Sequence, residues 1–210
     1  INIQNVYANI ELGVNEQQRD RQVQQLLNQH QKELLLLHDR TLFPVGSIRN
    51  QSNLPYQVFG AFKKNCYQRL QISLPQCYPP PSVQCPISLD FSTFDDAKLS
   101  ELQQHYAAKL NSENIELWPT GETHALRLLD QFIEERLNDY KRSRDLPAQT
   151  GTSQLSAYLN IGIISIRQCI QVLFREQHGH FVIQSEGQQT WLDELLWREF
   201  YQHILFDFPQ

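Results

Sequence analysis

Residues 191–204 read WLDELLWREFYQHI, and their spacing is that of a helix with two different sides. Four aromatic or charged side chains recur at intervals of three and four residues and share one face: Trp191, Glu194, Arg198 and Tyr201. Trp197 lies at the edge of this face, and leucines supply a separate apolar side. An aromatic and charged face of this kind indicates the lining of a ligand cavity. A buried ion pair between Glu194 and Arg198 within an aromatic core is the alternative.

A second informative stretch precedes it, because residues 144–162 read RDLPAQTGTSQLSAYLNIG. Pro147 and Gly151 are expected to end one helix, and Thr152 and Ser153 then stand where the next helix begins. A helix N-terminus offers unpaired N–H groups and partial positive charge, and two hydroxyls add further donors, which together suit a phosphate group. An ordinary N-cap is the alternative, since Ser and Thr are common before helices.

The rest of the chain divides into an α/β part and an all-helical part. Alternation predicts a strand over residues 3–10, helical spacing predicts a helix from Asn15 to about Leu36, and LLLLHD reads as a second strand at its end. Strand, helix, strand is the order of an α/β layer. Residues 40–121 are proline-rich, with helical patterns only near 58–70 and 97–110.

From Glu122 onward the sequence is helical. An apolar stripe runs from Ala125 to Leu137, and further helices are predicted over three segments: 153–160, 165–174 and 190–205. The predicted fold class is therefore α/β followed by all-α.

Composition sets the outer limits. The chain has 210 residues, a net charge of −5 and a pI near 5.8, so it is not a polycation that coats nucleic acid. Its longest apolar run, Leu34–Leu37, is too short to cross a bilayer, so no membrane partner is expected. The four cysteines lack CxxC spacing and are interpreted as free thiols of a reducing cytoplasm. The histidines are scattered, and no metal site is expected.

Taken together, the two stretches resemble the DNA photolyase/cryptochrome family, and specifically the bacterial class I cyclobutane-pyrimidine-dimer photolyases. VNEQQRD (14–20) and PYQVFGAF (55–62) extend the resemblance over nearly the whole chain. It implies that residues 1–39 are part of a Rossmann-like antenna domain, 40–121 an interdomain linker and 122–210 the first part of a helical FAD-binding domain. The implied activity is light-driven repair of pyrimidine dimers by electron transfer from reduced FAD. A cryptochrome-type photoreceptor without repair activity is the alternative.

The resemblance also implies roles for individual residues. The positions that match those holding the FAD phosphates and ribityl chain are Tyr140, Thr152, Ser153, Leu155 and Ser156. Those that match the cavity beside the flavin are Trp191, Glu194 and Arg198. Glu194 also matches the carboxylate that binds the base edge of the dimer, and Trp197 the indole on which the flipped lesion stacks. The implied contacts to DNA are Arg144, Glu194, Trp197, Arg198 and Tyr201. Asn15 and Glu16 match the pair that binds the antenna 5,10-methenyltetrahydrofolate.

The chain begins at Ile1, inside a predicted strand, and is expected to be a piece of a longer protein. Compared with the family it lacks the first antenna strands and everything after Gln210, so both chromophore sites are expected to be partial. The isolated piece is therefore expected neither to bind FAD tightly nor to repair DNA. The intact protein is expected to be a cytoplasmic monomer whose partner is UV-damaged DNA.

Overall fold

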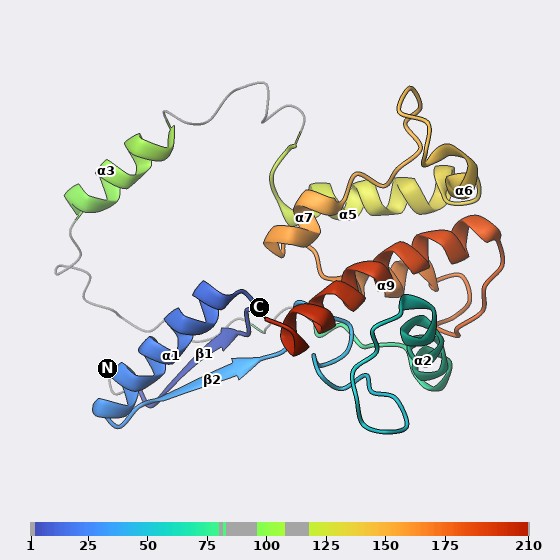
Figure 1. Ribbon diagram of the computed structural model, residues 1–210. Coiled ribbons are helices and arrows are strands. Elements are labelled where there is room, and N and C mark those ends of the chain that lie inside the picture. Colours follow the sequence, from blue (N-terminus) through green and yellow to red (C-terminus); the bar gives the residue numbers. More distant parts are fainter. Residues whose placement is uncertain (1–2, 80–81, 83–95, 108–117, 210) are drawn as a thin grey trace.

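The computed structural model describes residues 3–79, 82, 96–107 and 118–209. Its N-terminal unit is a single strand–helix–strand layer. Strand β1 (Asn5–Asn9) pairs in parallel with β2 (Glu33–Leu37), Asn5 opposite Glu33, and helix α1 (Val14–Gln29) connects them and lies along the strands (Figure 1). The predicted α/β layer is therefore present.

Helix α1 ends seven residues earlier than the sequence pattern predicted. Gln31 adopts a left-handed conformation with φ 56°, which terminates the helix and lets Glu33 start β2. No residue of α1 is buried, and Val23 and Leu26 are exposed. The leucines of residues 34–37 thus belong to the strand and not to the helix.

The remaining elements are helical. They are α2 (Phe59–Ile72), α3 (Asp96–Ala107), α5 (Glu122–Gln131), the π-helix η1 (Phe132–Arg136), α6 (Tyr140–Ser143), α7 (Ser156–Ile161), α8 (Ile166–Leu173) and α9 (Glu186–Asp207). Helix α9 crosses the centre of this assembly, while α3 stands away from the other helices (Figure 1). The side chains described in α3, residues 98–107, are all exposed. No helix in the described ranges is both long and apolar enough to cross a bilayer.

One hydrophobic core joins the segment 42–70 to the helices that follow residue 121. Phe62, Cys66 and Leu70 of α2 are at most 1% exposed and pack in the same cluster as Leu192 and Leu196 of α9. The region predicted as a linker therefore contributes one side of a helix to the core. Cysteines 66, 77 and 169 are free thiols, and Cys85 lies outside the described residues.

The segment after β2 is fixed to α9 by a carboxylate that is fully buried. The backbone N–H groups of Leu42 and Phe43 donate to Glu199, at 2.8 and 2.9 Å, and the N–H of Gly46 donates to Nδ1 of His203 at 3.3 Å. Arg49 completes the attachment with two 2.6 Å bonds to Asp207. Because each group satisfies a backbone or charged partner, the segment has little freedom to move along α9.

The local starts of the late helices follow their capping residues. Ser165 caps α8 through a reciprocal arrangement with Gln168, and Ser185 caps α9, so α9 begins four residues before the predicted Thr190. Helix α7 begins at Ser156 and not at Ser153 as predicted. Gln154, at φ 56°, interrupts the backbone there, and the buried Leu155 precedes the first helical residue.

Candidate functional site

The charged part of the predicted α9 face is joined to α6. Arg144 donates to Oε1 of Glu194 at 2.5 Å, and its guanidinium lies 5.6 Å from the ring centroid of Tyr140. The hydrogen bond with Glu194 raises the pKa of Arg144, so the guanidinium stays protonated. The alternative ion pair between Glu194 and Arg198 is wrong, because each has a different partner.

Two aromatic side chains of the candidate site lie in the core beneath this pair. Trp191 is 3% exposed and its ring packs 5.1 Å from Phe132, which in turn meets Tyr140 edge to face at 5.5 Å. Burial raises the pKa of the Tyr140 phenol. These rings connect the π-helix, α6 and α9, and they form the packed layer beneath the Arg144–Glu194 pair.

Trp197 lies in a different environment on the same helix. Its indole is stacked on Phe59 of α2, with ring centroids 3.7 Å apart and planes 13° from parallel. Tyr201 lies 5.7 Å from Trp197 at 25°, and it is 61% exposed. The predicted face of α9 is thus buried at Trp191 and increasingly exposed toward Tyr201.

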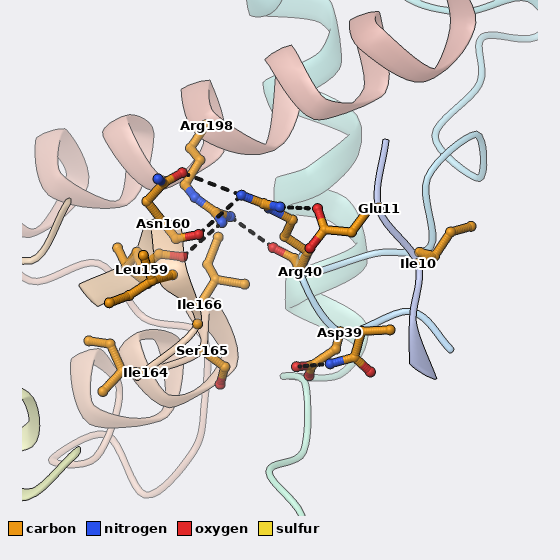
Figure 2. A pocket seen from close by; sticks show the side chains of 13 residues that line it. Ile10, Glu11, Asp39, Arg40, Leu159, Asn160, Ile164, Ser165, Ile166 and Arg198 are labelled. Carbon is orange, nitrogen blue, oxygen red and sulfur yellow. Dashed lines mark hydrogen bonds and ion pairs between the residues drawn. The ribbon is translucent and has the colours of Figure 1, made fainter. Parts of the chain in front are cut away.

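Arg198 points toward the N-terminal unit (Figure 2). It donates to the carbonyl oxygens of Arg40 at 2.8 Å and Leu159 at 3.3 Å, and burial lowers its pKa. Arg40 is paired with Glu11 and also donates to the carbonyl of Asn160 at 3.1 Å. These groups line a cavity of about 170 Å³ between the strand ends and helices α7 and α8. The structure therefore uses Arg198 to connect the two halves of the chain.

The loop 151–156 keeps its hydroxyl groups available. Across the described part of the chain, no hydrogen bond involves the side chains of Thr152, Ser153 or Ser156, and Thr152 is exposed. A Cβ on Gly151 would come within 2.6 Å of Ser143, so the loop backbone approaches α6 closely. Nε of Arg136 is buried without a partner, while its Nη1 donates to the Thr152 carbonyl at 3.4 Å. Thr152 and Ser153 lie in the loop before α7, so the prediction that they stand where that helix begins is wrong, whereas Ser156 is the first residue of the helix.

The second predicted pair stands at the start of α1. Asn15 is exposed and Glu16 is half-buried, with its carboxylate folded against Gly13. Both lie in the first turn of α1, where the helix dipole favours negative charge. Over the described ranges, no group of three or more His, Cys, Asp and Glu is placed to hold a metal ion.

Comparison with known proteins shows which family this chain resembles. A family model described as DNA photolyase matches residues 1–82. The deoxyribodipyrimidine photo-lyase of Buchnera aphidicola (strain APS) is 36% identical over 99% of the chain, and that of Vibrio cholerae is 37% identical over 98%. The chain belongs to the DNA photolyase family.

Solved structures of the family agree with the fold. A bacterial class III photolyase from Agrobacterium tumefaciens superimposes with a TM-score of 0.70 at 27% identity, over 98% of the chain and 41% of that structure. A cryptochrome from Synechocystis, at 20% identity, has a TM-score of 0.68 over 99% of the chain and 42% of that structure, and this likeness shows the fold alone. The chain spans 41% of the Buchnera photolyase and 42% of the Vibrio photolyase.

Several residues that shape this candidate site were not found from the sequence. Phe59 gives no local signal, because a Phe in an apolar pattern reads as core. Glu199 and His203 fall on the side of α9 predicted to be apolar, yet they hold the 42–46 segment. The partner of Glu194 is 50 positions away in the chain, and spacing within one helix could not identify it.

Proposed function

We propose that this chain is part of a deoxyribodipyrimidine photo-lyase that repairs cyclobutane pyrimidine dimers in DNA. The observation that carries the proposal is the close succession on α9 of Glu194, paired with Arg144, and the stacked indole of Trp197. It occurs in a chain similar over 98–99% of its length to named photolyases. We assign residues 1–39 to an antenna domain, 40–121 to a linker and 122–210 to part of an FAD-binding domain. The intact protein would be a cytoplasmic monomer that binds UV-damaged DNA.

The residues present fit an FAD molecule. Thr152, Ser153 and Ser156 offer free hydroxyl donors of the kind that phosphate oxygens require, and the close approach of Gly151 to α6 makes a narrow cradle. Leu155, Tyr140 and Trp191 are buried apolar and aromatic residues of the core that would lie beneath the cofactor. When bound and reduced, FAD supplies the electron that light drives to the dimer. On the same footing, Asn15 and Glu16 would hold the antenna 5,10-methenyltetrahydrofolate.

The chain's own residues would receive the lesion. A dimer flipped out of the duplex loses its stacking, and the indole of Trp197 can return roughly 1–3 kcal/mol per base. Glu194, when ionised, accepts hydrogen bonds from N–H groups of the pyrimidine edge. The guanidinium of Arg144 and the phenol of Tyr201 would contact the damaged strand. Arg198, proposed from the resemblance as a further DNA contact, would first have to leave the carbonyls of Arg40 and Leu159, to which it donates. Since phosphate contacts release counterions, affinity for DNA would fall steeply with added salt.

The paired presence of Trp197 and Glu194 favours repair over a photoreceptor role, because signalling alone requires no platform for a lesion. A visible absorption spectrum of the intact protein as purified, recorded before and after illumination with a thymine-dimer oligonucleotide, tests this. We expect flavin bands and light-dependent loss of dimers. Flavin bands without loss of dimers would replace repair by photoreception, and the absence of flavin would refute both.

A further inference from the structure

We infer that Phe59 is a positioning residue that sets the plane of the Trp197 indole for lesion recognition. The inference rests on the proposed function and adds to it a residue on a different helix. Phe59 and Trp197 are both half-buried, and their face-to-face contact at 3.7 Å is the closest ring contact among the described residues.

The indole contacts three rings, those of Phe59, Phe200 and the exposed Tyr201, and the first two restrict its orientation most. Phe59 covers one face, and Phe200 meets the indole edge to face at 5.8 Å and Phe59 at 5.9 Å. A tryptophan side chain turns about two bonds, and a face contact combined with an edge contact restricts both. A base can then stack only on indole surface that Phe59 leaves uncovered, so Phe59 limits the side of Trp197 on which the lesion can lie.

Helix α2 holds Phe59 rigidly against α9. One turn after Phe59, the ammonium of Lys63 pairs with Asp193 at 3.0 Å, and the hydroxyl of Tyr67 donates to the same carboxylate at 2.8 Å. We call Lys63, Tyr67 and Asp193 the polar clamp. Asp193 lies one turn before Trp197 on α9, so the polar clamp lies one helical turn from the Phe59–Trp197 stack and joins the same two helices. Lys63 also lies 5.9 Å from the Phe59 ring centroid. The polar clamp therefore fixes the position of Phe59 in the unliganded protein.

The test uses the intact, flavin-loaded protein at one fixed salt concentration. It compares binding of an oligonucleotide that contains one thymine dimer with binding of the same oligonucleotide without the dimer. Lesion discrimination is reported by a ratio, the dissociation constant for the undamaged oligonucleotide divided by that for the damaged one. We expect Phe59→Leu and Phe59→Met to reduce this ratio by about threefold to tenfold, with unchanged flavin content and unchanged affinity for undamaged DNA. Phe59→Tyr restores the ring and is expected to restore the ratio.

The matched control is Phe43→Leu. Phe43 is also half-buried, but its ring faces Arg69 at 5.7 Å and not Trp197, so the ratio should stay at its original value. A Phe59→Leu ratio equal to that of Phe43→Leu would overturn the inference. Should Phe59→Leu fail to fold, Phe59→Met decides, because Met adapts its shape without supplying a ring.

Trp197→Ala separates this inference from the function on which it rests. If Trp197→Ala leaves the ratio unchanged, the proposed platform itself is wrong. If Trp197→Ala lowers the ratio and the Phe59 variants do not, only the positioning role is wrong. In the double variant we expect the loss caused by Trp197→Ala alone, because Phe59 acts through the indole.

Discussion

Arg144 and Glu194 meet at 2.5 Å across the junction of α6 and α9, although they are 50 positions apart in the chain. The pair places a carboxylate and a guanidinium within the exposed half of α9's functional face, above the buried rings of Tyr140 and Trp191. It gives the proposed lesion site a defined charge arrangement, which can be tested by substitution.

Glu194→Ala should lower dimer repair while the flavin content stays unchanged. The variant removes one hydrogen-bond acceptor for the pyrimidine edge, and hydrogen bonds to charged groups are strong enough for a loss of roughly tenfold or more. Repair per absorbed photon and the visible flavin absorbance provide the two measurements. Glu186→Ala, at an exposed position of the same helix, is the control expected to change neither. Loss of flavin in Glu194→Ala would instead assign the residue a structural role.

Gly187→Ala and Gly60→Ala should have opposite effects on stability. A Cβ at residue 187 would lie 1.9 Å from the carbonyl oxygen of Leu137, and because this neighbour is backbone, we expect a loss of about 3 kcal/mol in the free energy of unfolding. At residue 60, in the first turn of α2, a Cβ meets nothing within 4 Å, and a gain of about 0.5 kcal/mol is expected. Urea unfolding measures both, and equal effects would contradict the packing described here.

The three free cysteines among the described residues should differ in reactivity. Burial raises the pKa of Cys169 to about 12 and raises that of Cys66 further, while Cys77 is only half-buried. Since the thiolate is the reactive form, Cys77 should be alkylated first at pH 8 and the other two only after unfolding. Peptide mass spectrometry of iodoacetamide-treated protein tells them apart. Rapid labelling of Cys169 in the folded protein would show that α8 is not packed as described.

Stability should decline at alkaline pH partly through Tyr67. Burial, followed by the hydrogen bond to Asp193, raises the pKa of this phenol above its ordinary value near 10. Above pH 10 the unfolded chain therefore loses this proton while the folded protein retains it, and the free energy of unfolding falls as pH rises. Tyr67→Phe should cost about 1 kcal/mol at pH 7 and flatten the decline above pH 10. Unfolding curves between pH 7 and 11 test this, and an unaltered slope would exclude Tyr67 as the cause.

The sequence predicts most elements because their signals are local. Alternation identified β1, leucine repetition identified β2, and the end of α7 follows from Gly162 in the left-handed conformation. The π-helix was missed, since Phe132–Arg136 continues the apolar spacing of α5 and a wider turn leaves that spacing almost unchanged. The start of α7 was misplaced because the conformation of Gln154 depends on how the loop packs on α6.

For the candidate site, the predicted helix is present as α9, but spacing did not identify the partners of the residues on its predicted face. Arg198 reads as part of one ligand cavity, yet its bonds lead to Arg40 and Leu159. Trp197 can be singled out from the sequence as an aromatic residue beside the predicted face. The contact of Phe59 with Trp197 becomes visible only when α2 is packed on α9. Contacts between distant segments determine these roles, and no pattern within a single helix encodes them.

Helix α9 is secured along its whole length, by Gly187 against the Leu137 carbonyl, by Asp193 with α2, by Arg198 with the strand ends and by Asp207 with Arg49. Rotation of the helix about its axis would break all of these contacts together. The face that carries Glu194 and Trp197 is consequently preorganised, and binding loses little conformational entropy in ordering it. A nucleic acid that binds there would therefore meet a rigid protein surface and would itself undergo the larger conformational change.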